Sequence, residues 1–166
     1  QIPMQIMSIQ VGNTPNSATV FNVACGVEYA VRHQVDVINI SMGYLGERVP
    51  LLDTIMTTDA AKDIFIVTSS GHDSVNTDIY DHWPSNLAGE AGNEHIFSVA
   101  SFGTNGSGTY FISKQSNYGE NTVNIAAPGE NIYGAVNGGG YGFKSGTSMS
   151  AAFVSGFAAA MKASNP

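Results

Sequence analysis

The sequence predicts one α/β domain with an open, mostly parallel β-sheet and helices on both faces. Its length of 166 residues suits a single domain. Strand-like and helix-like segments alternate along the chain, which is the pattern of parallel sheets with crossover helices. The strand-like segments are short and nearly continuously apolar, as expected for strands buried on both faces.

The first part of the chain contains one cycle of strand, helix and strand. Met4–Val11 is predicted to form a strand, and a polar loop follows at 12–17. From Ala18 to His33 the apolar residues recur at helical spacing. The β-branched run Val35–Ile40 predicts a buried strand that ends at Ser41-Met42-Gly43.

A second cycle follows in the middle of the chain. Leu51–Lys62 carries its apolar side chains on one helical face, and Ile64–Thr68 predicts a strand that ends at Ser69-Ser70-Gly71-His72. The remaining predicted elements are strands at Ile96–Ser101, Val123–Ala126 and Ile132–Val136 and a helix at Met149–Ala163. Ligand sites in open α/β sheets lie at the carboxyl ends of strands, so the polar segments after Ile40 and Thr68 are candidate site segments.

The composition excludes several classes of function. The net charge is −7 and the six Lys and Arg are scattered, so we expect no nucleic-acid-binding face. No apolar run approaches the ~18 residues of a membrane span. Charged residues make up only 11%, about half the usual ~25%. Such a surface fits a secreted hydrolase, or a fragment that a neighbouring segment would cover. The first residues contain no initiator Met, which is typical of a processed or excised piece.

The one cysteine, Cys25, allows no intrachain disulfide. It lies in a run predicted to be a buried helix face, where a free thiol behaves as a small hydrophobic group.

Residues Gly146 to Ser150 open the last predicted helix and carry the candidate chemistry. A serine in this position, such as Ser148, is ordinarily a helix N-cap. Two features favour a nucleophile. The glycines between Gly138 and Gly142, together with Gly146, keep side chains away from the approach, and the positive end of the helix dipole would stabilise an oxyanion beside Ser148.

Four motifs resemble those of the subtilase family of serine peptidases. Ser145-Gly146-Thr147-Ser148-Met149-Ser150-Ala151-Ala152-Phe153-Val154-Ser155-Gly156 is similar to the family's nucleophile signature, Gly-Thr-Ser-Met-Ala-Ala/Ser-Pro-His-Val-Ala-Gly. The other three are residues 124–133, 116–119 and 35–43, and all four stand in the family's order.

The resemblance implies a subtilisin-like domain, partial over residues 1–166, that lacks the family's N-terminal strands. It also implies a serine endopeptidase with Ser148 as the nucleophile. In the family, an Asp and a His precede the segment that corresponds to Met4–Val11, so we expect them outside this sequence and the chain alone to be almost inactive. His33, His82 and His95 are expected to be solvated or hydrogen-bonded surface residues.

His72 stands where the family has the Asn that donates to the oxyanion. Ser69-Ser70-Gly71-His72-Asp73 aligns with the family's Ala-Ala-Gly-Asn-Glu. An imidazole N–H can also donate, so the catalytic role of His72 can survive. The alternative is a degenerate oxyanion site in a non-catalytic module that binds peptides or regulates. A third hypothesis, His72 as the general base, is disfavoured because the family geometry directs this residue at the oxyanion.

The resemblance implies two substrate-binding segments. An extended peptide would pair with Ser41, Met42 and Gly43, and its side chain before the scissile bond would enter a slot between these residues and Ser69, Ser70 and Gly71. The small residues predict room for a sizeable apolar side chain. Phe153, where the family has His, is expected to pack inside a helix interface.

The absent strand predicts a folding problem, because its removal leaves backbone groups unpaired. Three solutions are open: a companion N-terminal chain, direct pairing of Met4–Val11 with Val35–Ile40, or a swapped second copy. We expect a secreted or extracytoplasmic protein with a peptide or protein substrate and no cofactor. Structural calcium is common in the family, but Asp78, Asp81 and Glu90 form no diagnostic ligand set.

Overall fold

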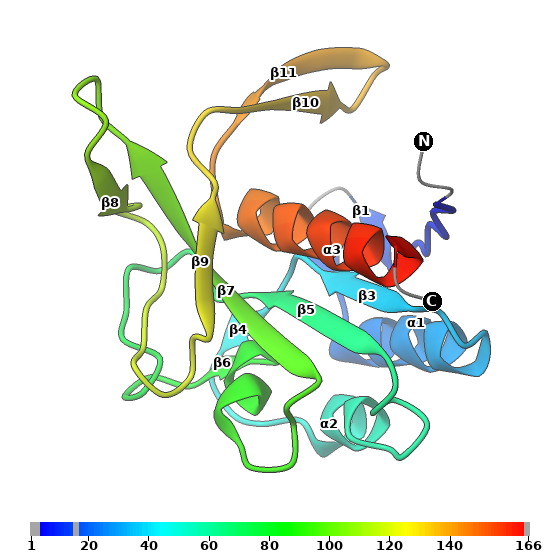
Figure 1. Ribbon diagram of the computed structural model, residues 1–166. Helices are drawn as coiled ribbons and strands as arrows, with labels where there is room; N and C mark the ends of the chain where they lie inside the picture. Colours follow the sequence, from blue (N-terminus) through cyan, green and yellow to red (C-terminus); the bar gives the residue numbers. More distant parts are fainter. Residues whose placement is uncertain (1–3, 15–16, 165–166) are drawn as a thin grey trace.

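The computed structural model describes residues 4–14 and 17–164, and its centre is a mostly parallel β-sheet (Figure 1). The strand order is β3-β5-β7-β8, and β9 also pairs with β7. The parallel strands are β3 (Val37–Ile40), β5 (Phe65–Ser69), β7 (Ile96–Thr104) and β9 (Ile125–Pro128). The strand β8 (Tyr110–Ile112) runs antiparallel to the end of β7.

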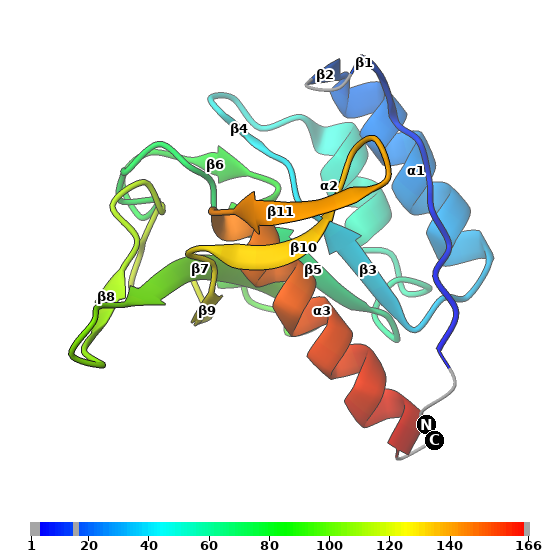
Figure 2. The ribbon, with the colours of Figure 1, turned by 90° about the horizontal axis from the view of Figure 1, so that it is seen from above.

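Helices cover both faces of this sheet, as the sequence predicts (Figures 1 and 2). On one face, α1 (Val20–Arg32) and α2 (Pro50–Met56) enclose a core in which Ile38, Ile66 and Ile96 lie side by side on three adjacent strands. On the other face, α3 (Thr147–Ser164) packs Ala151 against Val67 and Val99. The α/β fold class is therefore confirmed.

Smaller elements flank the sheet. The pair β4 (Tyr44–Leu45) and β6 (His82–Trp83) is followed by a 3₁₀ helix at Ser85–Gly89. The hairpin of β10 (Ile132–Val136) and β11 (Gly140–Lys144) projects above α3 (Figures 1 and 2). A short hairpin of β1 (Gly12–Thr14) and β2 (Ser17–Ala18) lies ahead of α1, where a loop is predicted. The middle of that predicted loop, residues 15 and 16, lies outside the described residues.

The strand predicted at Met4–Val11 is wrong. These residues form an extended segment that runs beside α1 without a hydrogen-bonded neighbour strand (Figure 2). Ile9 and Val11 pack against the α1 core, and a Cβ added to Gly26 of α1 would lie 2.7 Å from the Val11 side chain. Packing on the helix therefore holds this segment, not sheet pairing.

The strand β3 is an edge strand whose only partner, among the residues described, is β5. The predicted alternative of direct pairing between Met4–Val11 and β3 is therefore not adopted. The outer edge of β3 carries backbone N–H and C=O groups without partners in the sheet.

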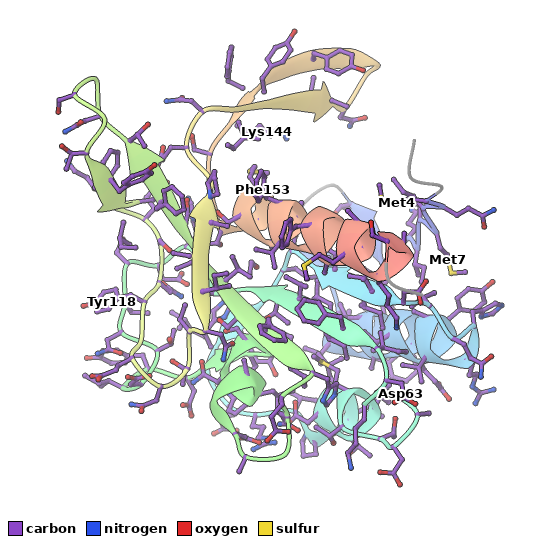
Figure 3. All side chains as sticks on the ribbon, in the orientation of Figure 1. Met4, Met7, Asp63, Tyr118, Lys144 and Phe153 are labelled. Carbon is purple, nitrogen blue, oxygen red and sulfur yellow. The ribbon has the colours of Figure 1, made fainter. Side chains whose placement is uncertain are left out.

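Three further predictions are wrong in detail. The helix α2 ends at Met56 and the chain continues in a series of turns; at the C-cap, the Thr57 hydroxyl donates to the Asp53 carbonyl. Cys25 is exposed, since α1 buries positions on either side of it and Cys25 points away from them. Phe153 is 57% exposed and projects from α3 on the side away from the sheet (Figure 3), because α3 faces the sheet with small residues instead.

Within residues 4–14 and 17–164, no helix combines the length and the apolar character that crossing a membrane requires.

Candidate active site

The polar segments after β3 and β5 meet the first turn of α3 at the carboxyl edge of the sheet. A cavity of about 260 Å³ lies where they meet. It is lined by Ser41, Met42 and Gly43 after β3, by Ser69, Gly71 and His72 at the end of β5, and by Thr147 and Ser148 of α3. The structure thus gathers residues that lie more than 100 positions apart in the sequence.

Ser148 is half-buried in the first turn of α3. Its Oγ donates a hydrogen bond to the Ser41 carbonyl at 3.2 Å, and Ser41 Oγ donates to the Ser148 carbonyl at 3.1 Å. Gly146 has φ +144°, and its N–H donates to the Gly129 carbonyl at 2.7 Å. This backbone conformation favours glycine and sets the start of α3. The helix N-terminus places positive potential beside the Ser148 hydroxyl.

The second wall of the cavity differs in part from the prediction. Ser69 and Gly71 line the cavity, but Ser70 does not. Ser70 is fully buried, and its Oγ donates to the Asn117 carbonyl at 3.1 Å. Its role is therefore to tie this segment to residue 117, and any contact that it makes with a bound peptide runs through its backbone.

Asn117 is a buried residue whose part in the site the sequence analysis missed. Its Nδ2 donates to the Ser70 carbonyl at 3.0 Å, and its Oδ1 accepts the N–H groups of Asp73 and Val75 at 2.8 and 3.2 Å. The signal was present, because Asn117 lies in one of the four matching motifs, residues 116–119. The motif alone did not indicate that it holds the segment after β5.

His72 lies at the mouth of the cavity with an exposed side chain. Its Nε2 is 2.5 Å from Gln115 Oε1, and because an amide oxygen only accepts, Nε2 carries the proton. The Cε1–Nδ1 side of the ring faces the loop before Ser148, since a Cβ on Gly146 would lie 3.1 Å from His72 Cε1 and 3.4 Å from Nδ1. Among the described residues, no histidine hydrogen-bonds to Ser148 Oγ.

His82 is not the surface residue that the sequence predicts. It is 3% exposed, it lines the same cavity, and its Nδ1 bonds to Ser85 Oγ at 2.8 Å. Burial lowers the pKa of His82, and the charge of Asp73 opposes this shift. The ring is therefore neutral near neutral pH.

The other two histidines lie away from the cavity. His33 is exposed at the C-terminal end of α1, where its ring bonds to the Tyr29 carbonyl, which agrees with its prediction. His95 is half-buried and bonds to the Met56 carbonyl.

The three acidic residues considered as calcium ligands have separate protein partners. Asp78 accepts the N–H groups of Glu120, Asn121 and Thr122, and hydrogen bonds from Thr122 and from these amides lower its pKa. Asp81 accepts from Asn86 Nδ2, and Glu90 pairs with Arg48. Across residues 4–14 and 17–164, no three His, Cys, Asp or Glu side chains come close enough to hold a metal ion.

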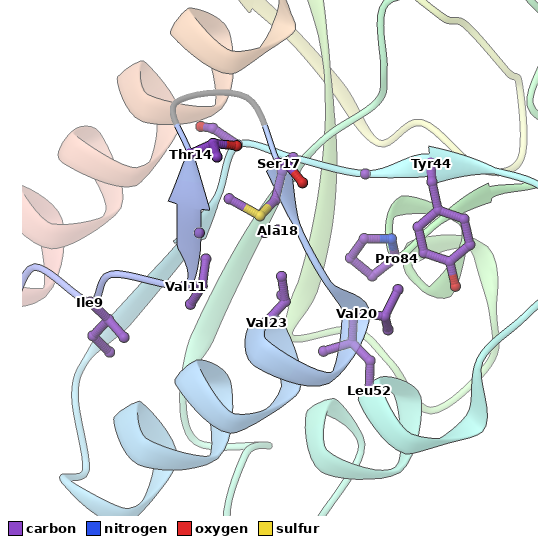
Figure 4. Close-up of a pocket in the computed structure, with 14 residues that line it drawn as sticks. Ile9, Val11, Thr14, Ser17, Ala18, Val20, Val23, Tyr44, Leu52 and Pro84 are labelled. Carbon is purple, nitrogen blue, oxygen red and sulfur yellow. The ribbon is translucent and has the colours of Figure 1, made fainter. Parts of the chain in front are cut away.

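A larger cavity of about 770 Å³ lies next to the segment that follows β3 (Figure 4). Ile9 and Val11 of the N-terminal segment line one side, and Tyr44 and Pro84 line the other. Ser41, Met42 and Gly43 border both cavities.

Comparisons with known proteins agree with this arrangement. The family model described as the subtilase family, peptidase S8, matches residues 3–166. The chain is 30% identical over 157 residues to an intracellular serine protease of Paenibacillus polymyxa, which covers 95% of this chain and 45% of that protein. It is also 30% identical over 142 residues to subtilisin-like protease 2 of Plasmodium falciparum, covering 84% of this chain and 10% of that protein.

Solved structures give the same result. A cold adapted subtilisin-like serine proteinase superposes with a TM-score of 0.74 at 27% identity, covering 91% of this chain and 50% of that one. The patellamide maturation protease PatA superposes with a TM-score of 0.72 at 29% identity, covering 90% and 52%. The chain thus spans about half or less of the length of each of these four proteins. With its ordered motifs, its sheet and its serine at the start of α3, this chain belongs to the subtilase family of serine peptidases.

Proposed function

We propose that the protein to which this chain belongs is a serine endopeptidase with Ser148 as its nucleophile. One observation carries the proposal: Ser148 stands at the N-terminus of α3 in a cavity whose walls are the ends of β3 and β5. The general base and the carboxylate that orients it would come from the part of the longer protein outside this sequence. Without a base, a serine hydroxyl is a weak nucleophile near neutral pH, so this chain alone is almost inactive.

In the proposed reaction, Ser148 Oγ attacks the peptide carbonyl while its proton passes to the base. The backbone N–H of Ser148 and the ring of His72 hold the resulting oxyanion. The Cε1–Nδ1 side of the His72 ring faces Gly146, while Nε2–H is anchored on Gln115. Donation from Nδ1 with that anchor in place requires the protonated ring, which would be a strong donor to an oxyanion. Collapse of the intermediate expels the amine, which takes the proton from the protonated base. The same base then deprotonates a water, which attacks the acyl-enzyme and releases the acid and Ser148.

The substrate would lie in extended form along Ser41, Met42 and Gly43, with its side chain in the 260 Å³ cavity. Both the Ser41 segment and the Gly71 segment reach Ser148 or its neighbour through hydrogen bonds, since Thr147 Oγ1 donates to the Gly71 carbonyl at 3.2 Å. These bonds hold the binding segments in register with the nucleophile.

A companion segment of the longer protein would add an extended strand to the outer edge of β3. The unpaired edge of β3 and the 770 Å³ cavity next to the segment that follows it, Ser41–Tyr44, support an added strand. The chain spans about half or less of the relatives compared above, which favours a segment of the longer protein over a swapped copy. The cavity wall formed by Ile9 and Val11 would pack against the added strand.

An extracytoplasmic location is part of the same proposal. The charged fraction of 11% supports it, although the relative from Paenibacillus polymyxa is named as intracellular. Fractionation of cells that express the complete gene, with detection of the protein in the medium or the cell pellet, decides between the two locations.

A fluorophosphonate probe applied to the full-length parent tests the mechanism. We expect labelling of the parent and hydrolysis of peptides, with both lost in Ser148→Ala. Ser164→Ala, at an exposed serine on the same helix, is the matched control and should label like the wild type. An unlabelled parent, or equal labelling of Ser148→Ala, would exclude this mechanism. An unlabelled parent that still binds peptides would support the rival function, a non-catalytic peptide-binding module.

A further inference from the structure

The buried ring of His82 lies against both walls of the cavity that holds Ser148. A Cβ added to Gly43 would come within 2.3 Å of His82 Cε1, and one added to Gly71 would come within 2.6 Å of His82 Nε2. The ring therefore touches the backbone of the segment after β3 and of the segment after β5. Both positions must be glycine for the ring to fit between them.

The hydrogen bonds of Ser85 indicate which ring nitrogen of His82 carries the proton. The single hydroxyl proton of Ser85 is donated to the His82 carbonyl at 2.9 Å. Ser85 Oγ can then only accept from His82 Nδ1, at 2.8 Å. Since the buried ring is neutral, Nδ1 holds its proton and Nε2 keeps a lone pair.

This lone pair has no partner among the residues that the structure describes, and the ring lines the cavity. The buried side-chain atoms that lack a partner do not include Nε2, whose ring lines the cavity. An apolar side chain bound in the cavity would exclude water from this acceptor and leave it unpaired, whereas a side chain of the same shape that donates a hydrogen bond would satisfy it. The cavity therefore differs from the roomy apolar slot that the small residues of the sequence predict.

We propose that His82 makes this site selective for substrates with a hydrogen-bond donor, an amide or a hydroxyl, on the side chain before the scissile bond. The proposal rests on the proposed function, because it takes the cavity beside Ser148 as the place of that side chain. It assigns to His82 a role in specificity, through contact with the substrate, and no role in the proton transfers.

Matched peptide pairs measured on the full-length parent test the proposal. The pairs differ only at the residue before the scissile bond, Gln against Met and Thr against Val, which are close in shape. One net hydrogen bond predicts that kcat/KM is about fivefold to tenfold higher for Gln and for Thr. In His82→Phe the ring volume is kept but the acceptor is lost, and both ratios should fall to about one or invert.

Two further variants keep the test decisive. Ser85→Ala frees the tautomer and should reduce both ratios without abolishing hydrolysis, which covers the case that His82→Phe fails to fold. His33→Phe, at the exposed histidine that ends α1, should leave both ratios unchanged.

The outcomes separate this proposal from the mechanism. A parent that hydrolyses peptides with ratios near one, or with ratios that His82→Phe leaves intact, overturns the role of His82 and leaves Ser148 in place. In the second case another acceptor on the cavity wall, such as Asp73, makes the selection. If the parent hydrolyses nothing, dissociation constants of the same pairs decide, and equal constants for each pair overturn the proposal.

Discussion

At the scale of single residues, one departure of this chain from the family motifs, His72, lines the cavity that holds Ser148. His72 replaces an Asn, and the structure keeps it at the mouth of the cavity, with one ring edge on Gln115 and the other toward Gly146. The site therefore retains a polar ring where the family has an amide donor. If this ring donates to the oxyanion, its removal lowers kcat, so kcat of His72 variants tests the role.

Substitution of His72 in the full-length parent tests whether this residue donates a hydrogen bond to the oxyanion or whether the oxyanion site has lost this donor. We expect His72→Ala to lower kcat by about 10²–10³, the range known for loss of such a donor in subtilisin, a member of the same family. His72→Asn restores an amide donor and should keep kcat within about tenfold of the wild type, with KM almost unchanged in both variants. Equal kcat values for His72→Ala and the wild type would show that the oxyanion is held without this residue.

At the scale of elements, the conformation of the segment after β5 depends on contacts with another loop, in addition to the pairing of β5 in the sheet. Asn117 links the segment after β5 to the loop that precedes β9 through four contacts: the Ser70 carbonyl, the N–H groups of Asp73 and Val75, and the Asp73 carboxylate. The segment that lines the cavity thus takes its conformation from a side chain about 45 positions later in the chain.

Removal of the Asn117 amide should loosen the site and the fold together. Asn117→Ala leaves buried N–H and C=O groups unpaired, so we expect a loss of about 2–4 kcal/mol in the free energy of unfolding of the parent. Urea unfolding measures this loss. Asn105→Ala, at an exposed asparagine in the turn between β7 and β8, is the matched control and should cost less than about 1 kcal/mol. Similar losses for the two variants would refute the anchoring role of Asn117.

At the scale of the whole molecule, the outer edge of β3 has no partner strand among the described residues. The N–H of Phe65 donates to the Asp36 carbonyl, so residues 36, 38 and 40 direct their backbone groups to β5. Val37 and Asn39 therefore present theirs to the outer edge, because these directions alternate along a strand. An edge of this kind invites pairing with another strand.

Amide hydrogen exchange in the full-length parent tests the companion strand. The N–H groups of Val37 and Asn39 should be protected to about the same degree as that of Val67, which lies in the central strand β5. Fast exchange at Val37 and Asn39 would mean that the edge stays open in the complete protein. Protection that depends on protein concentration, with a dimer in light scattering, would instead indicate a swapped second copy.

The sequence by itself determined the α/β fold class, the larger strands and helices and the family, and it predicted Ser148 as the nucleophile. These follow from local patterns: apolar runs at Val35–Ile40 and Ile64–Thr68, the helical spacing of the segment that forms α1, and the motif around Ser148. These apolar segments were predictable because the spacing of apolar residues along the chain indicates a buried strand or helix whatever its neighbours are.

Only the tertiary structure decided what depends on distant partners. Met4–Val11 has strand-like residues but no strand to pair with, so it packs on α1 instead. His82 looks like a loop histidine, yet Gly43 and Gly71 enclose its ring and make it part of the cavity wall. Phe153 lies in an apolar helix but faces away from the sheet. Burial and hydrogen-bond partners come from segments far apart in the chain, and no local pattern in the sequence specifies them.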